Sequence, residues 1–230
     1  TPIQQALHRL WEIVLWAKLN RRYRLLPTAQ KEPEARGEQT AAFLVRDNIR
    51  HRRDIEEAYL AAIAAASEDI ILANAYFLPG RRFRRALQDA VKRGVQVVIL
   101  LQGRIEYRLL HYATQALYGK LLGAGIRIFE YRRSFLHAKV AVIDHHWATV
   151  GSSNIDPFSL LLAREANVVV KDRKFADELR RSLRQAMQNG ARELPFDSWK
   201  RLPWHSRLLR WASYNLVRIL VGIAGYGGKR

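Results

Sequence analysis

The chain has 230 residues, and because 49% of them are hydrophobic it can bury a core and is not a disordered tail. Its 39 basic and 21 acidic residues give a formal net charge of +18, which favours an anionic partner: nucleic acid, an acidic membrane surface or a phosphorylated small substrate. The absence of cysteine excludes disulfides, thiolate catalysis and cysteine-based zinc sites, and it fits a cytoplasmic setting.

Residues 1–40 predict a helix followed by a linker. Apolar residues recur from Ile3 to Ala17 at three- and four-residue spacing, which is typical of an amphipathic helix. The segment from Pro27 to Thr40 is polar and contains two prolines and a glycine. Because the chain opens without methionine and enters the helical pattern at once, we expect this part to come from a preceding region of a longer protein.

Helical and extended patterns alternate from residue 41 to 195, where we expect the main folded domain. The expected strands are 41–45, 69–73, 95–101, 126–131, 138–143, 147–150 and 166–170, and the expected helices are 53–66, 81–93, 108–122 and 173–188. The continuous apolar run at 95–101 is typical of an internal strand. This order predicts the α/β class, with an α/β/α sandwich around a mostly buried mixed sheet.

The clearest chemical pattern surrounds His137 and Lys139. These residues are two apart, so on a strand an imidazole and an ammonium point to the same face. Farther along, Gly151 would let the backbone approach a ligand closely, and Ser152 and Asn154 would add hydrogen-bond donors. Together these groups predict a phosphate site.

The arrangement H-x-K-x4-D-x6-G-S-x-N, from His137 to Asn154, resembles the HKD signature of the phospholipase D superfamily. Counting five of its six fixed residues at about one in twenty each, a chance match in this length is on the order of one in ten thousand. The resemblance extends over about residues 48–190 and is greatest to bacterial cardiolipin synthases of the B type. The segment 70–79, which includes Asn74, Tyr76 and Phe77, looks like the substrate-side segment of those synthases; ordinary strand-end packing is the alternative.

The resemblance implies a role for each motif residue. His137 would be either the nucleophile that forms a phosphohistidine or the acid that protonates the leaving alcohol. Lys139 would hold the phosphate oxygens, and Ser152 and Asn154 would complete that cradle. Since lysine and histidine already neutralise the phosphate, the reaction would need no divalent metal or other cofactor.

Two acidic residues complete the expected catalytic group. The resemblance implies that Glu165 orients and polarises His137. Asp144, the last residue of the HKD triplet, is expected to fix local structure rather than to contact the phosphate. The adjacent His145 and His146 have no carboxylate at a suitable spacing, so a solvated turn is favoured over a metal site.

The sequence departs from the family pattern in two ways. The superfamily normally brings two motifs together, whereas one is present here, so a second half is expected from a missing N-terminal region or from another chain. Ala163 also occupies a position where the synthases usually carry asparagine, which would remove one hydrogen bond near the site.

Residues 196–230 predict a basic amphipathic tail. On a helical wheel, Arg207, Arg210, Tyr214 and Arg218 lie on one side, and the apolar residues of 208–223 lie on the opposite side. This pattern is typical of a helix lying on a membrane surface. The alternative is a terminal helix packed on the domain or on the missing half. No run of about 18 uncharged apolar residues occurs, so no membrane span is predicted.

We therefore expect phosphatidyl transfer of the cardiolipin synthase type, with phosphatidylglycerol as the donor, by a peripheral protein on the cytoplasmic face of the bacterial inner membrane. The alternatives left open are a phospholipase D-family hydrolase or nuclease and a non-catalytic membrane-binding half. A nucleic-acid partner is not expected, because the sequence offers no obvious aromatic stacking platform.

Overall fold

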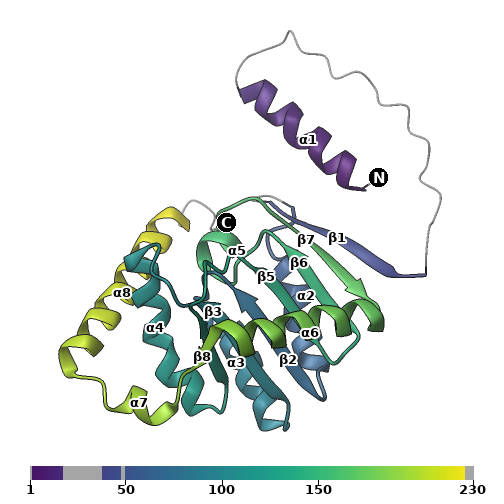
Figure 1. Cartoon of the computed structure of the whole chain (residues 1–230). Helices are drawn as coiled ribbons and strands as arrows, with labels where there is room; N and C mark the ends of the chain where they lie inside the picture. The colour runs from purple at the N-terminus through teal and green to yellow at the C-terminus, as the bar shows by residue number, and fades with distance from the viewer. Residues whose placement is uncertain (1, 18–37, 48–49, 226–230) are drawn as a thin grey trace. The chain divides into compact units, whose positions relative to one another are not determined.

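The computed structural model describes residues 2–17, 38–47 and 50–225 (Figure 1). It divides into two units, residues 1–39 and residues 40–230. The first unit contains the predicted N-terminal helix, α1 (Pro2–Ala17), which exposes Ile3, Leu7, Leu10 and Trp11. Most of the expected linker, residues 27–37, lies outside the described residues, as does the end of the tail, residues 226–230.

The second unit is built on an eight-stranded mixed sheet with the order β1-β7-β6-β5-β2-β3-β4-β8. Its strands are β1 (Thr40–Arg46), β2 (Asp69–Asn74), β3 (Gln96–Gln102), β4 (Arg127–Tyr131), β5 (Lys139–Ile143), β6 (Trp147–Gly151), β7 (Glu165–Lys171) and β8 (Ala191–Glu193). The pairs β2–β3 and β3–β4 are parallel, and the other neighbouring pairs are antiparallel. This sheet confirms the predicted α/β class.

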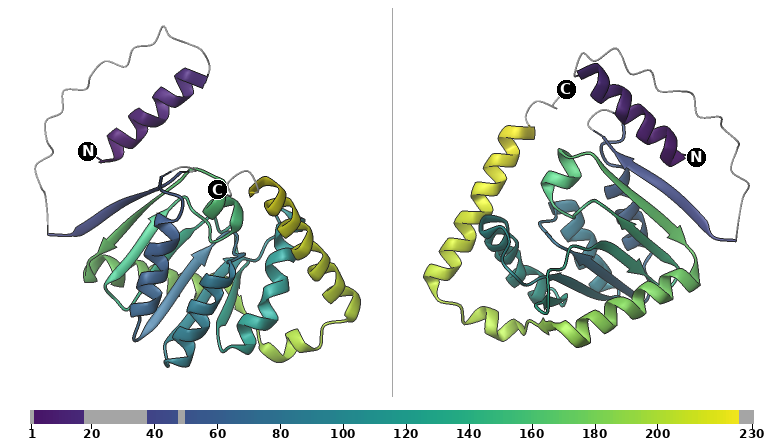
Figure 2. Two further views of the ribbon diagram at one scale, coloured as in Figure 1. Left: turned by 180° about the vertical axis from the view of Figure 1, so that it is seen from behind. Right: turned by 45° about the horizontal axis from the view of Figure 1, so that its top comes forward.

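Helices cover both faces of the sheet (Figures 1 and 2). One face carries α2 (Asp54–Ala65), α3 (Arg81–Lys92) and α4 (Arg108–Gly123), and the other carries α6 (Arg173–Gly190). Alternate residues of β2 separate the two cores: Ile70 and Leu72 pack with the first group, whereas Ile71 and Ala73 pack toward α6. The α/β/α sandwich is therefore confirmed, with β2 buried along its whole length.

Three short elements were not predicted: α5 (Pro157–Leu161), α7 (Phe196–Lys200) and β8. Each has five residues or fewer, too few to show a helical or strand period in the sequence. The ends of α3 and α4 were well signalled, since Gly94 and Gly125 have φ angles of +92° and +87°. Residues other than glycine rarely adopt positive φ angles, so these glycines let the chain turn from each helix into the next strand.

The C-terminal helix α8 (Trp204–Gly225) packs along α4 (Figure 2). The packed stripe is narrow and includes the buried Ser213, Val217 and Val221. The opposite side is exposed and apolar, with Trp204, Leu208, Leu209, Trp211, Leu216, Ile219 and Leu220 between 44% and 75% exposed. The helix thus packs on the domain and still presents a hydrophobic side. Among the described helices, none is long and apolar enough to cross a membrane.

Candidate active site

One edge of the sheet brings together residues from five strands. Lys139 begins β5 and lies opposite Asn74 at the end of β2. Gly151 ends the neighbouring β6, and Glu165 begins β7. Glu165 in turn lies opposite Arg46, the last residue of β1. Because antiparallel strands run in opposite directions, the start of one and the end of the next meet at the same edge.

Lys139 is the central cation of this edge. It is 8% exposed, and its Nζ lies 3.5 Å from the carbonyl oxygen of His137, whose own side chain is exposed in the loop before β5. Burial lowers the pKa of Lys139, although the carboxylates of Glu165, Asp156 and Glu106 act in the opposite direction. The ammonium is therefore partly desolvated and faces three acidic groups.

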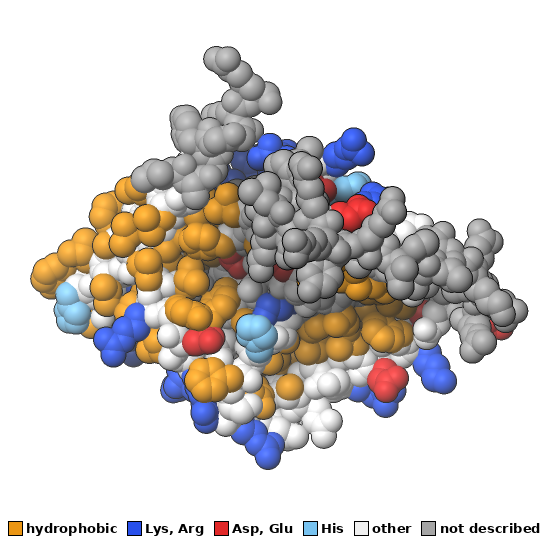
Figure 3. Space-filling model, turned by 90° about the horizontal axis from the view of Figure 1, so that it is seen from above, with side chains coloured by type: hydrophobic (Ala, Val, Ile, Leu, Met, Phe, Trp, Pro, Cys, Tyr) orange, Lys and Arg blue, Asp and Glu red, His pale blue; other side chains and the backbone are white. Residues whose placement is uncertain are grey.

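Figure 3 shows the molecule from the end where α5 lies. Basic, histidine and acidic side chains lie beside one another near the middle of this face, and hydrophobic side chains gather over the side where α8 lies. Three large apolar residues are exposed on the loops that follow β3 and precede β5: Ile105, Tyr107 and Phe135. The charged cluster therefore has an apolar rim, which suits a ligand with both a charged and an apolar part.

Asp156 was not identified from the sequence. It caps α5, since its Oδ1 accepts hydrogen bonds from the backbone N–H groups of Phe158 (2.8 Å) and Ser159 (3.1 Å). Burial raises the pKa of this carboxyl group, and the nearby Glu165 adds to the shift. The signal that could have found it is Asp156-Pro157, a capping residue followed by proline at the first helical position.

Glu165 and Ser152 form a pair. The Ser152 hydroxyl donates a hydrogen bond to Glu165 Oε2 and accepts one from the backbone N–H of Ala166 at 3.1 Å. The sequence-based expectation was that Glu165 braces His137. In the structure its hydrogen bond goes to Ser152, and its charge acts on Lys139. The serine hydroxyl is thus held in place by β7 beside the lysine.

Asn154 and Asn74 connect the motif to β2. Asn154 is 8% exposed, and its Oδ1 accepts a hydrogen bond from the backbone N–H of Tyr76 at 3.4 Å. Asn74 is fully buried, and its Oδ1 accepts a hydrogen bond from the backbone N–H of Ile155 at 3.1 Å. The buried Phe77 forms a backbone bridge with the same Ile155. Asn74 and Phe77 therefore support the motif loop, while Tyr76 remains half-buried at the site.

Gly151 lies close against β7. A Cβ atom there would lie 2.2 Å from Asn167 Oδ1, so only glycine leaves room for this side chain. Asn167 is 1% exposed; its Oδ1 accepts a hydrogen bond from the backbone N–H of Ser153 (3.3 Å), and its Nδ2 donates one to Thr149 Oγ1 (3.2 Å). This asparagine was missed in the sequence, because nothing local marks it as the partner of the motif glycine.

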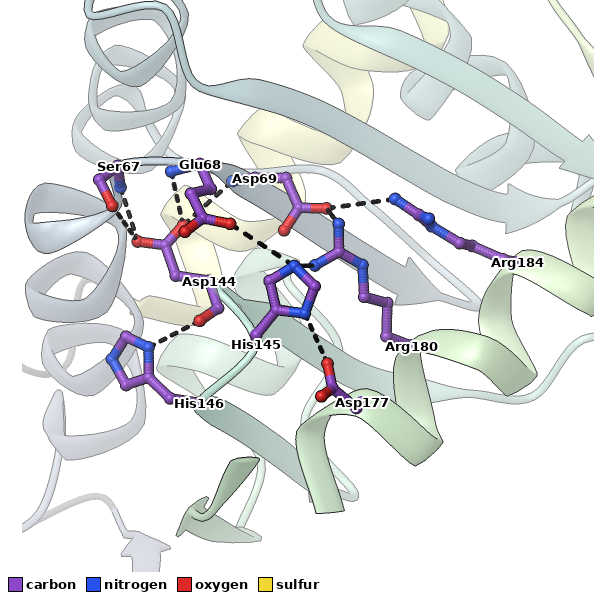
Figure 4. Close-up of polar contacts among 9 residues, drawn as sticks. All are labelled: Ser67, Glu68, Asp69, Asp144, His145, His146, Asp177, Arg180 and Arg184. Carbon is purple, nitrogen blue, oxygen red and sulfur yellow. Dashed lines mark hydrogen bonds and ion pairs between the residues drawn. The ribbon is translucent and has the colours of Figure 1, made fainter. Parts of the chain in front are cut away.

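Asp144 lies at the opposite edge of the sheet (Figure 4). Its carboxylate accepts hydrogen bonds from the backbone N–H groups of Ser67 (2.6 Å), Glu68 (2.8 Å) and Asp69 (3.0 Å). Burial alone would raise the pKa of Asp144, but these bonds hold it below its ordinary value. These bonds fix the turn before β2, and the whole length of β5 separates Asp144 from Lys139.

His145 lies at the same end of the sheet as Asp144, and its side chain makes polar contacts there. Its Nδ1 lies 2.5 Å from Asp177 Oδ1, and its Nε2 contacts Arg180 (Figure 4). Arg180 in turn forms an ion pair with the buried Asp69. These contacts join α6 to the start of β2. In the described part of the chain, no group of three or more histidine, aspartate and glutamate residues is arranged to hold a metal ion.

Residues 59–187, more than half of the chain, match the family described as "Cardiolipin synthase, PLD-like domain". The chain belongs to this family. Cardiolipin synthase B of Salmonella typhi is 38% identical over 190 residues, which cover 83% of this chain and 46% of that protein. The PLD-like chain therefore spans about half the length of the curated relatives it matches.

Two solved structures share the fold. The phospholipase D family member Nuc from Salmonella typhimurium has a TM-score of 0.58 and 24% identity, covering 69% of this chain and 99% of that one. The phosphatidylserine synthase of Haemophilus influenzae Rd KW20 has a TM-score of 0.64 and 11% identity, covering 87% of this chain and 49% of that one. At these identities the likeness shows the fold alone.

Proposed function

We propose that this chain supplies one half-site of an enzyme that transfers a phosphatidyl group from one phospholipid to the alcohol of another, as a cardiolipin synthase does. The observation that carries the proposal is the partly desolvated ammonium of Lys139 beside the exposed His137, with Ser152 and Asn154 on the adjoining loop. These are the groups that the family motif requires, and they lie at one edge of the sheet.

The transfer takes two displacements at phosphorus. In the first, an imidazole nitrogen attacks the phosphodiester, an N–P bond forms, and the P–O bond to the headgroup alcohol breaks as that oxygen receives a proton. In the second, the alcohol of a second lipid attacks phosphorus and the N–P bond breaks. The attacking alcohol gives its proton to the group that protonated the leaving oxygen in the first step. His137 serves as the nucleophile or as the proton donor, and Lys139 stabilises the charge on the non-bridging oxygens.

The charge of the cluster supports the need for a second half. The ammonium of Lys139 is under the influence of the carboxylates of Glu165, Asp156 and Glu106. A phosphodiester carries a negative charge, so these carboxylates oppose its binding and further cations would favour it. A second HKD half, in another part of the natural protein or in another chain, supplies these further cations and so offsets the negative charge of the bound phosphodiester.

The exposed apolar side of α8 supports a membrane surface as the working environment. Seven large hydrophobic side chains of this helix are at least 44% exposed, two of them tryptophan. Tryptophan prefers the membrane interface, and a helix with such a side lies in the headgroup region without crossing the bilayer. With the net charge of +18, we place the enzyme at an anionic surface, the cytoplasmic face of the bacterial inner membrane, with phosphatidylglycerol as substrate.

The test is product analysis by mass spectrometry. The complete natural protein is incubated with phosphatidylglycerol vesicles and EDTA, beside a His137→Ala variant. Cardiolipin and glycerol from the wild type alone are the expected result, with a loss of about a thousandfold or more in the variant. Phosphatidic acid in place of cardiolipin would make the enzyme a hydrolase. The absence of any lipid product would contradict the proposal and direct the same preparations to DNA.

A further inference from the structure

Arg46 is a buried cation at the edge of the candidate active site, and the chemistry above does not use it. It is the last residue of β1 and is 1% exposed. Burial and the nearby Arg52 lower the pKa of Arg46, and the carboxylates of Asp47 and Glu165 act in the opposite direction. Arginine stays charged in proteins, and a buried charge is costly unless it is paired and hydrogen-bonded. The contacts of this guanidinium therefore indicate what it does.

The guanidinium of Arg46 joins β1 to the segment between α5 and β7. Its Nη1 donates a hydrogen bond to the carbonyl oxygen of Ala163. The backbone N–H of Ala163 in turn donates a hydrogen bond to the carbonyl oxygen of Phe158, in α5, at 2.8 Å. Figure 1 shows α5 at the end of the sheet where β1 ends and β7 begins. Ala163 is therefore held on one side by α5 and on the other by Arg46.

This segment lies between two carboxylates that act on Lys139. Asp156 caps the start of α5, and Glu165 is the first residue of β7. Both carboxylates oppose the effect of burial on the pKa of Lys139, and that of Glu165 is the larger influence. Since Ala163 is two residues before Glu165, a fixed Ala163 carbonyl sets the place where β7 begins. The hydrogen bond from Arg46 thus helps to decide how close Glu165 lies to Lys139.

Glu165 also lies directly across the sheet from Arg46. The two residues are opposite each other in the antiparallel pair of β1 and β7. Side chains at directly opposite positions lie on the same face, with Cβ atoms about 4.5–5.5 Å apart. The guanidinium offsets the charge of Glu165 from the side of β1, while the Ser152 hydroxyl donates a hydrogen bond to Glu165 from the loop after β6. A guanidinium that is 1% exposed offers no surface to a phosphodiester, so Arg46 acts through Glu165 and does not bind substrate.

We propose that Arg46 is a positioning residue of this active site: it holds the start of β7 so that the Glu165 carboxylate stays beside Ser152 and Lys139. The inference rests on the proposed function and adds to it a residue outside the HKD motif. If Glu165 moves away, its opposition to burial is lost and the pKa of Lys139 falls. The protonated ammonium that stabilises the phosphate then persists over a narrower range of pH.

The experiment compares pH profiles of kcat/KM in the complete natural protein. Two substrates are used: phosphatidylglycerol in vesicles, and a soluble aryl phosphodiester, bis(p-nitrophenyl) phosphate. The variants are Arg46→Met, Arg46→Lys, Glu165→Gln and the double variant of Arg46→Met with Glu165→Gln. Arg93→Met is the matched control, because the Arg93 guanidinium also donates hydrogen bonds to backbone carbonyls, those of Ile63 (2.8 Å) and Ala66 (3.3 Å), at the opposite end of the sheet. Urea unfolding of each variant is recorded beside the rates.

Arg46→Met is expected to lower kcat/KM about tenfold or more, since a small displacement of a catalytic group is costly. It should also move the alkaline decline to lower pH, as Glu165→Gln does. Adding Arg46→Met to Glu165→Gln should shift the decline no further, because two changes that act through one group are not additive. Arg46→Lys keeps the charge without the arginine fork, so its decline should lie between those of the wild type and Arg46→Met. Arg93→Met should leave the decline in place, whatever its stability.

Three results would overturn the inference. A decline of Arg46→Met that stays in place would leave Arg46 with a purely structural role. A decline that moves to higher pH would show that Arg46 repels the Lys139 ammonium directly. A double variant that shows the sum of the two single shifts would separate Arg46 from Glu165. If Arg46→Met does not fold, Arg46→Lys decides, and a decline at the wild-type pH or above it overturns the inference.

The second substrate separates this inference from the proposed function. A wild type that cleaves the aryl phosphodiester and forms no cardiolipin contradicts phosphatidyl transfer alone, and the pH profiles on the aryl substrate then decide the role of Arg46. A wild type that is inactive on both substrates contradicts the proposed function and this inference together.

Discussion

Asn74 lies directly opposite Lys139 in the antiparallel pair of β2 and β5, and its side chain is completely buried. Its Oδ1 accepts the hydrogen bond of Ile155 N–H, one residue after the motif Asn154. The amide side chain thus joins β2, the strand paired with the lysine-bearing β5, to the loop that contains Asn154. Support of this kind keeps catalytic groups within the narrow range of positions that transfer requires.

Replacing Asn74 should loosen this connection. Asn74→Ala leaves a buried backbone N–H without an acceptor, which is expected to destabilise the fold by about 1–3 kcal/mol and to reduce phosphatidyl transfer. Urea unfolding and transfer rates measure the two effects. Asn189→Ala, at an exposed position of α6, serves as the control and should change neither. Equal stability of Asn74→Ala and the wild type would show that Asn74 does not support the loop.

The alkaline limit of the reaction should depend on Glu165. Lys139 must be protonated to stabilise the phosphate, so activity is present below its pKa and is lost as pH rises through it. Burial lowers this pKa, and the Glu165 carboxylate is the largest of the opposing influences. In Glu165→Gln the pKa of Lys139 falls further, and the alkaline decline of kcat/KM moves to lower pH. The pH profile measures this shift, and a decline that stays in place or moves to higher pH contradicts it.

Asp144 should matter for stability and not for the chemistry. Asp144→Ala leaves three backbone N–H groups without their acceptor and places alanine at a φ of +48°, with an expected cost of about 2–4 kcal/mol. Urea unfolding measures the cost. The rate per folded molecule should equal that of the wild type, and a large loss of that rate would return Asp144 to the catalytic group.

The same residue should make stability depend on pH in a defined direction. The pKa of Asp144 is lower in the folded protein than its ordinary value. Its contribution is therefore present above the unfolded pKa of about 3.9 and is lost as pH falls through the folded pKa. The difference in unfolding free energy between wild type and Asp144→Ala should shrink between pH 5 and acid conditions. A difference that stays constant over this range would show that the charge is not involved.

The two sides of α8 can be separated by neighbouring substitutions. Leu216→Ser with Ile219→Ser changes the exposed side and should reduce co-sedimentation with phosphatidylglycerol vesicles about tenfold or more, because each side chain loses about 1.5–3 kcal/mol of apolar burial. The thermal midpoint should be retained. Val217→Ser changes the buried stripe and should lower the midpoint instead. Unchanged vesicle binding by the double variant would assign the exposed side to another protein surface, such as the second half-site.

The sequence by itself determined the longer elements and directed attention to His137 and Lys139. Glycines at 94 and 125, apolar strands and amphipathic helices were readable because each depends on contacts within a few residues. His137 and Lys139 were found because the motif is continuous in the chain. The short elements α5, α7 and β8 were not found, since their formation depends on capping and pairing rather than on a repeating pattern.

Only the tertiary structure decided which residues share an edge of the sheet. Strand order placed Glu165 and Arg46 beside the motif, although both are far from Lys139 in sequence. It also showed that α8 packs through Val217 and Val221 and exposes its broader apolar side. Register and packing are long-range properties, set by burial over the whole domain, and no local pattern of residues contains them.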